Sequence, residues 1–210
     1  MVFLYGIFSI FPMIPEELLE SHNALRKKYV KGDIIFREGD LPSQYFQIIL
    51  GEVKMCNFND DGREFTQGFF HPKQSFGEPP LFLNRVYPAN AIAVSDCELF
   101  VLSKPLFLDL IQKNTSVSLS IIENLAQRLH YKSVMAAEIS SQEPEHRLLK
   151  LIDYSIKFFK TEKETQGYRI DLTRQQMADL TGLRVETVIR AIKALEKKSE
   201  IKIINRKVYR

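Results

Sequence analysis

The change of pattern near residue 103 is the feature that most constrains how this chain can fold. Between residues 29 and 102, short runs rich in β-branched and aromatic residues alternate with Gly, Pro, Asn and Asp. Residues 106–143 contain no Gly or Pro, and their apolar residues recur every three or four positions. The first pattern predicts an antiparallel sandwich or roll, and the second predicts a long helix. We therefore expect an α+β fold with strands and helices in separate segments.

Six runs of strand length lie in the first part of the chain: residues 33–36, 44–50, 52–58, 63–70, 91–94 and 97–102. Residues 59–62, Asn-Asp-Asp-Gly, have the composition of a hairpin turn, which explains their paired acids without a catalytic role. We assign residues 1–114 to a jelly-roll-like antiparallel β-roll that acts as a sensor domain. The apolar opening, residues 1–15, lacks a basic start and is shorter than the roughly 20 residues of a membrane span. This favours a buried N-terminal segment over a signal peptide.

The helical pattern predicts a helix over residues 115–142 that carries two apolar stripes. The first stripe steps alternately by three and four positions and comprises Leu119, Ile122, Ala126, Leu129, Ser133 and Ala136. The second comprises Ile121, Leu125, Met135 and Ile139. One stripe can pack on the sheet domain and the other on the same helix of a second copy, so we expect a homodimer. The alternative is a helix buried within one subunit.

Pro144 marks the next boundary, because proline cannot continue a helical hydrogen-bond ladder. We place a third segment at residues 143–210. Within it, residues 184–210 hold nine Lys or Arg and three Glu, a net +6 in a chain of net +3, which leaves residues 1–183 at −3. A basic end on a slightly acidic body favours a domain that contacts nucleic acid. A solvated basic surface is the alternative.

Residues 172–198, LTRQQMADLTGLRVETVIRAIKALEKK, have the pattern of two helices joined by a tight turn. Thr173 can cap the first helix, Ala178 is small enough for a close helix crossing, and Gly182 suits the turn. Thr181 stands where an apolar residue would be more usual. Residues 201–210, IKIINRKVYR, form two short β-like runs around a turn and complete a winged helix-turn-helix. A purely structural helical hairpin is the alternative.

This order of sheet domain, long helix and winged helix-turn-helix resembles the Crp/Fnr family of bacterial transcription regulators over nearly the whole chain. KGDIIFREGDLPSQYFQIILGEVKM resembles the family's opening strands, FGEPPLF its phosphate cassette, and LTRQQMADLTGLRVETVIRAIKALE its DNA-reading helices. The last match is the most specific. This segment is closer to the fumarate-nitrate branch of the family than to the cyclic AMP receptor, because it contains Val185-Glu186-Thr187 followed by Arg190. That branch, however, has serine in place of Ile189.

The resemblance implies a homodimeric, sequence-specific regulator of transcription that is not an enzyme. It implies binding to a palindromic DNA operator and contact with RNA polymerase through loops such as residues 59–64 and 161–167. The two cysteines, Cys56 and Cys97, lie far apart and fit a reducing, cytoplasmic setting. The alternative function is a sensor of a cyclic nucleotide or another small ligand that acts mainly through protein contacts.

Eight residues are candidates for DNA contact. Arg190 can donate two hydrogen bonds to guanine and Glu186 can accept one from a cytosine amino group, so together they can read a G·C pair. Val185 and Ile189 are expected to project into the major groove beside them. Contacts to phosphate are expected from Thr173, Arg174, Gln175 and Thr187.

The cassette raises a question about the effector. In cyclic-AMP-binding members the glycine and glutamate that Gly77 and Glu78 match are followed by an Arg-Ser pair that holds the cyclic phosphate. That pair falls here on Pro88 and Ala89, which offer neither a positive charge nor a hydroxyl group. We therefore expect no control by cyclic AMP. Arg85 is expected at the surface.

Three residues of the long helix are further candidates for an effector pocket. The positions that meet the adenine correspond to Lys132 and Ser133, and Arg128 lies one turn before them. The lysine suits an anionic ligand or one of a different kind, and the alternative is that either cation caps the dimer seam or stays solvated. We expect no iron–sulfur cluster, because residues 1–30 contain no cysteine, and no haem, because His71 is a lone candidate expected to be exposed. The effector, the promoters, the sign of regulation and any redox role of the two cysteines stay open.

Overall fold

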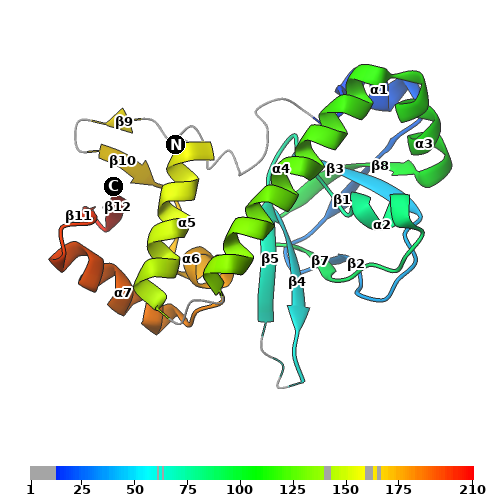
Figure 1. Cartoon of the computed structure of the whole chain (residues 1–210). Helices are drawn as coiled ribbons and strands as arrows, with labels where there is room; N and C mark the ends of the chain where they lie inside the picture. Colours follow the sequence, from blue (N-terminus) through cyan, green and yellow to red (C-terminus); the bar gives the residue numbers. More distant parts are fainter. Residues whose placement is uncertain (1–12, 61, 63, 140–142, 159–162, 165–166) are drawn as a thin grey trace. The chain divides into compact units, whose positions relative to one another are not determined.

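The computed structural model describes residues 13–60, 62, 64–139, 143–158, 163–164 and 167–210 (Figure 1). Within this part of the chain the predicted α+β architecture of antiparallel sheets, long helix and winged helix-turn-helix is confirmed. The chain divides into two compact units, one spanning Phe8–Gln127 and the other including Arg128–Arg210. We call them the sheet unit and the helical unit. Of the apolar opening, Met13 and Ile14 are buried as expected, and residues 1–12 lie outside the described residues.

Two four-stranded antiparallel sheets form the sheet unit. The first has the order β1-β8-β3-β6, and its strands are β1 (Leu25–Tyr29), β8 (Cys97–Ser103), β3 (Gln44–Leu50) and β6 (Ser75–Phe76). The second has the order β2-β7-β4-β5, and its strands are β2 (Ile34–Phe36), β7 (Asn90–Ala93), β4 (Val53–Phe58) and β5 (Glu64–Phe70). Apolar side chains of both sheets pack into one core, with Phe46 and Val101 from the first and Met55 and Ala91 from the second.

The outer face of the first sheet is covered by helices. Along β8 the side chains alternate: Leu99 and Val101 face the core between the sheets, whereas Phe100 and Leu102 face the helices. Both faces of this strand are therefore buried, which explains its continuous apolar run. The covering helices are α1 (Glu16–Ser21), α3 (Lys104–Lys113) and α4 (Thr115–Ile139). They contribute Leu19, Phe107, Leu110, Val117 and Ile121 to this second core.

The helical pattern after residue 103 folds as two helices, and the second begins at Thr115, where the predicted long helix also begins. Asn114 adopts φ −127° and ψ 87°, outside the helical region, and its side-chain amide donates a 2.8 Å hydrogen bond to the Leu110 carbonyl. The helix α4 then begins at Thr115 and is described as far as Ile139. No Gly or Pro lies at this break, and the first helix ends at the Asn114 side chain instead.

The two stripes of α4 have different environments. Ile121 of the second stripe is buried in the core of the sheet unit, and Leu125 packs against it. In the first stripe Leu119 and Ile122 are each 61% exposed and Leu129 is 68% exposed. The polar and small members Ala126, Ser133 and Ala136 are exposed too. An apolar seam of coiled-coil spacing is thus left open in the single chain.

Besides the end of α4, the described residues of the helical unit form three helices and a small antiparallel sheet. Its helices are α5 (Pro144–Phe158), α6 (Arg174–Thr181) and α7 (Val185–Lys197), and α7 packs against both others. Its strands are β9 (Lys163–Glu164), β10 (Gly167–Ile170), β11 (Lys202–Ile204) and β12 (Lys207–Tyr209), in the order β11-β12-β10-β9. The wing predicted from residues 201–210 is confirmed, with its turn at Asn205 and Arg206, both at positive φ.

Candidate nucleic-acid interface and effector pocket

The first helix of the helix-turn-helix, α6, is fixed at both ends by local hydrogen bonds. At its start the Thr173 hydroxyl oxygen accepts from the Gln176 N–H at 3.1 Å, and the Gln176 side chain accepts from the Thr173 N–H at 2.9 Å. This reciprocal pair is a capping box. At its end Gly182 has φ 67°, a left-handed conformation that glycine adopts without strain. The turn therefore follows directly from the sequence.

Thr181 is fully buried at the end of α6, although its side chain is polar. Its hydroxyl group donates to the Met177 carbonyl at 2.6 Å and lies 3.3 Å from the Ala178 carbonyl. A hydroxyl bonded within its own helix can be buried at little cost. The threonine is therefore accommodated at a position where an apolar residue would be more usual.

The second helix, α7, has two faces of opposite character. Its buried face consists of Val188, Ala191, Ile192 and Leu195, each at most 4% exposed. Its open face consists of Glu186, Ile189, Arg190 and Lys193, all exposed. Both sets repeat at positions i, i+3, i+4 and i+7, so each occupies one side of the helix. Packing of the first set against α5 and α6 fixes the direction in which the second set projects.

The other predicted contact residues lie near the starts of the two helices. Thr173 and Gln175 are exposed, while Val185 and Thr187 are half-buried. Arg174 is half-buried as well, and its guanidinium lies 3.4 Å from the carbonyl of Arg206 in the turn of the wing. The start of α6 and the wing are therefore neighbours within the helical unit.

Two further basic residues share this surface and were not among the predicted contacts. Arg184 is exposed at the N-cap of α7, and no side-chain hydrogen bond caps that helix. Lys193 follows Glu186 by seven positions and lies on the same open face. Helical periodicity alone could have identified Lys193, because an i+7 position returns to the same side of the helix.

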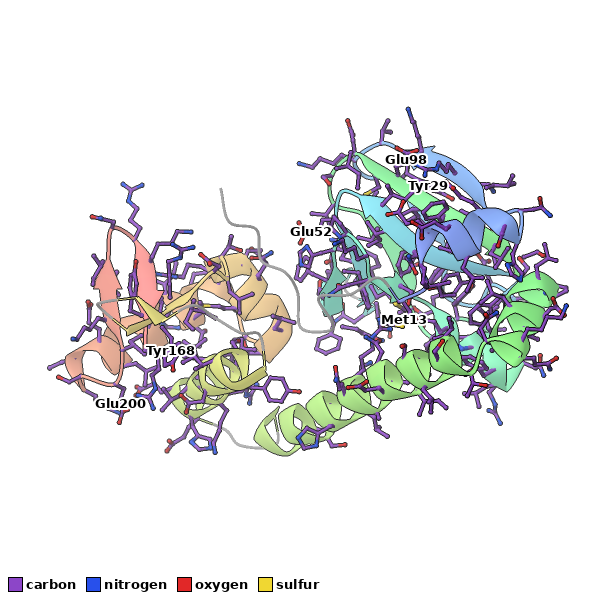
Figure 2. All side chains as sticks on the ribbon, turned by 90° about the horizontal axis from the view of Figure 1, so that it is seen from above. Met13, Tyr29, Glu52, Glu98, Tyr168 and Glu200 are labelled. Carbon is purple, nitrogen blue, oxygen red and sulfur yellow. The ribbon has the colours of Figure 1, made fainter. Side chains whose placement is uncertain are left out.

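Part of the basic charge at the end of the chain is used within the fold. Arg210 forms ion pairs with Asp153 at 2.9 Å and with Glu200 at 2.7 Å, and Glu200 is labelled in Figure 2. Lys198 pairs with Glu145 at 2.6 Å. The local charge of +6 therefore overstates what the wing and α7 can offer to phosphates.

The predicted effector cassette lies where β6 meets the short helix α2 (Glu78–Leu83). Gly77 precedes the helix with φ 79°, and a Cβ atom built on it would lie 3.1 Å from the Phe36 ring and 3.2 Å from the Tyr87 ring. Glu78 is 1% exposed and accepts a short hydrogen bond from the Ser75 hydroxyl. The two matching residues, Gly77 and Glu78, are thus parts of a packed region.

Tyr87 fills much of this region. Its ring stacks on Phe36 with centroids 3.7 Å apart and planes 9° apart, and the residue is 3% exposed. Its hydroxyl group donates a long hydrogen bond, 3.4 Å, to the Gln44 carbonyl. Burial, followed by the charges of Glu78 and Asp40, raises the pKa of Tyr87 far above its usual value. The phenol therefore stays protonated and neutral at any physiological pH.

The positions predicted to lack the phosphate ligands are Pro88, which is exposed, and Ala89, which is fully buried. The Pro88 carbonyl accepts from the Asn57 side-chain amide at 2.7 Å, and the same amide donates to Glu38 at 2.9 Å. The Glu38 N–H in turn donates to the Asn90 side chain at 3.1 Å. The group bonded to Pro88 is thus a neutral amide, which is itself bonded to a carboxylate. Arg85 is exposed, as expected.

The remaining predicted pocket residues belong to the helical unit. Lys132 and Ser133 are exposed and Arg128 is half-buried. The Ser133 hydroxyl group donates to the Leu129 carbonyl of its own helix at 2.9 Å. Partial burial of the ammonium group and the charge of Arg128 lower the pKa of Lys132. Asn124 lies one turn before Arg128 and is 3% exposed. Neither polar atom of its side chain has a partner among the described residues.

The residues considered for other sensor chemistries have the following surroundings in the described part of the chain. His71 is half-buried rather than exposed, and burial lowers its pKa to about 4. The buried thiols Cys56 and Cys97 lie on different sheets, and burial raises the pKa of Cys56 to about 11. Among the described residues no three His, Cys, Asp or Glu side chains are grouped to hold a metal ion. None of the helices described there could cross a membrane.

Comparisons with known proteins match two separate parts of the chain to two domain families. Residues 26–114 match the model of the cyclic nucleotide-binding domain, and residues 146–209 match that of the Crp-like helix-turn-helix domain. The cyclic AMP receptor protein of Thermus thermophilus is 28% identical over 196 residues, which cover 91% of this chain and 86% of that protein.

Two solved structures share the fold. The c-di-GMP responsive global regulator CLP of Xanthomonas campestris has a TM-score of 0.71 at 24% identity, with 92% of this chain and 96% of that chain covered. A CooA variant from Carboxydothermus hydrogenoformans has a TM-score of 0.78 at 16% identity, covering 92% of this chain and 85% of that chain. The sequence match and the structural match therefore extend over both units.

Proposed function

The chain belongs to the Crp/Fnr family of transcription regulators, and from this premise we propose that it binds a roughly palindromic DNA operator as a homodimer, without control by cyclic AMP. It is a DNA-binding regulator of the Crp/Fnr type and not an enzyme. The observation that carries the proposal is the open face of α7, where Glu186 and Arg190 are exposed beside each other. Such a helix fits a major groove about 12 Å wide.

The chemistry of this face supports sequence-specific reading. The Arg190 guanidinium can donate to both O6 and N7 of guanine, and the Glu186 carboxylate can accept from the amino group of cytosine. Lys193, Arg184 and the wing are placed to neutralise phosphates, which sets the position of the helix without reading bases. Both kinds of contact are needed, since phosphate contacts give affinity and base contacts give specificity.

The open seam of α4 supports the homodimer. Leu119, Ile122 and Leu129 are each more than 60% exposed and follow coiled-coil spacing, so a second copy of the helix would bury them. A twofold pair presents two α7 helices, which would enter successive major grooves one helical turn, about 34 Å, apart. The operator would then be an inverted repeat. Loops at residues 59–64 and 161–167 are proposed to contact RNA polymerase in the cytoplasm, as the family resemblance implies.

The cassette supports independence from cyclic AMP. A buried cyclic phosphate needs a counter-charge, and leaving it unpaired costs several kcal/mol, enough to abolish micromolar binding. Pro88 and Ala89 supply none, and the groups bonded around Pro88 are amides and the Glu38 carboxylate. Titration calorimetry with cyclic AMP and cyclic GMP tests this part, and the expected result is no measurable binding heat. Micromolar binding of either nucleotide would overturn it and favour the alternative of a nucleotide sensor.

The DNA-binding part is tested by selecting a site from random duplexes and measuring the affinity of Arg190→Ala. Loss of one bidentate guanine contact costs about 1–3 kcal/mol for each half-site, so we expect at least a 30-fold loss on an operator with two half-sites. The preference for guanine at one position of each half-site should disappear. The matched control is Arg37→Ala, which removes an exposed arginine of the sheet unit and should leave affinity unchanged. Identical base preferences for wild type and Arg190→Ala would contradict the assignment.

A further inference from the structure

Ile189 is an apolar side chain in the middle of the charged, open face of α7. It is 40% exposed, and the exposed residues Glu186, Arg190 and Lys193 surround it at helical spacing. It takes no part in the core of the helical unit, which α7 reaches through Val188, Ala191, Ile192 and Leu195. A single exposed isoleucine is common on proteins. This one stands where side chains are expected to meet base edges.

An aliphatic side chain cannot form hydrogen bonds, so in a major groove it can favour only an apolar group. The edges of the four base pairs present one such group there, the C5 methyl of thymine. Isoleucine is also stiff, because a β-branched side chain in a helix has one strongly preferred χ1 rotamer. Holding it against a methyl group therefore costs little conformational entropy.

We propose that Ile189 selects a thymine in each half-site by packing on its 5-methyl group, next to the G·C pair read by Glu186 and Arg190. This inference rests on the proposed function and adds a specific base to it. The placement follows from the helix: Ile189 is three residues after Glu186 and one before Arg190, so it lies on the same face. Because the Ile189 side chain is shorter than those of Glu186 and Arg190, we place its contact on the base pair next to the G·C pair that they read.

Val185 is the other aliphatic residue at this end of the helix. It is the first residue of α7 and is half-buried, so less of its side chain is available to a base. Ile189 lies in the second turn, between charged residues that are themselves exposed. The geometry therefore favours Ile189 as the reader of the methyl group, and Val185 is the rival reader to be tested beside it.

Replacing thymine by uracil removes the methyl group and leaves every hydrogen-bonding group of the base in place, so it tests the proposal directly. On a selected operator, each thymine is replaced by uracil in turn, together with its symmetry mate, and affinity is measured by fluorescence anisotropy. A methyl-sized contact is worth about 0.8 kcal/mol, which predicts about a fourfold loss for each half-site and about fifteenfold for both. We expect this loss at one position of each half-site for the wild-type protein.

The variants assign the effect to a side chain. Ile189→Ala should bind the thymine and uracil operators equally, whereas Val185→Ala should retain the discrimination. Thermal melting of both variants checks that the helical unit stays folded. Discrimination that persists in Ile189→Ala, or that is lost only in Val185→Ala, would overturn the proposal. Binding that no uracil substitution weakens would overturn it and leave the proposed function intact, whereas failure to bind any duplex would remove both.

Discussion

The open face of α7 and the cassette around Gly77 are built in opposite ways, although family resemblance assigns a ligand to each. On α7 the apolar residues are buried against α5 and α6, and the charged ones project outward. In the cassette Glu78 and Tyr87 are both buried, and Tyr87 stacks on Phe36. A surface that binds must leave its reactive groups accessible. By this criterion the open face of α7 is accessible to a ligand, whereas Glu78 and Tyr87 of the cassette are part of the packed core.

The largest expected effect in the sheet unit comes from removing the ring that fills the cassette. Tyr87→Ala deletes a side chain that is 3% exposed and stacked on Phe36, and losing a buried aromatic ring typically costs about 3–5 kcal/mol. Chemical denaturation, monitored by a circular dichroism signal that does not come from tyrosine, would measure the loss of stability. The matched control is Phe58→Ala at the end of β4, where the ring is 49% exposed, with an expected cost of about 1 kcal/mol or less. Equal losses for the two variants would show that Tyr87 does not hold the cassette together.

The next effect concerns pH and again probes how closely the sheet unit is packed. Burial lowers the pKa of His71 from 6.5 to about 4. Between these two pH values the His71 imidazole is therefore protonated in the unfolded chain and neutral in the folded chain. The free energy of unfolding should therefore fall as pH drops from about 6.5 to about 4, by up to about 3 kcal/mol, and level off below. Denaturation series at several pH values would measure this slope. His71→Gln should flatten it, and an unchanged slope in that variant would assign the pH dependence to other groups.

The ends of the helix-turn-helix could be predicted from the sequence because their causes are local. Thr173 caps through a residue three positions away, and Gly182 needs only its own backbone freedom. The strand β1 was not predicted, since its sequence, LRKKY, carries three charges and four of its five residues are exposed. Charged, exposed sequences are typical of edge strands, where hydrogen bonds to one neighbour replace hydrophobic patterning.

The packing of the cassette depends on residues far apart in the chain and gave no local signal. Counting from Glu78 identified Pro88 and Ala89, but the stack of Tyr87 on Phe36 joins segments 51 positions apart. His71 was likewise expected to be exposed from its sequence context, but it is half-buried. Local chemistry thus predicted the helix-turn-helix better than the packing of the cassette.

The smallest effect sharpens the comparison at the start of α6, where one residue is predicted to serve both structure and binding. Thr173 closes the capping box and is also a candidate for phosphate contact, since it is exposed beside Arg174. Thr173→Ala should lower the stability of the helical unit by about 1 kcal/mol, because a lost N-cap typically costs that much. Aspartate caps as well as threonine, so Thr173→Asp should restore stability. If the hydroxyl group also faces a phosphate, however, the new negative charge should weaken DNA binding several-fold, most strongly at low salt. Equal DNA affinity for wild type and Thr173→Asp would show that the residue acts only as a cap, and would limit the phosphate contacts to the basic residues of α7 and the wing.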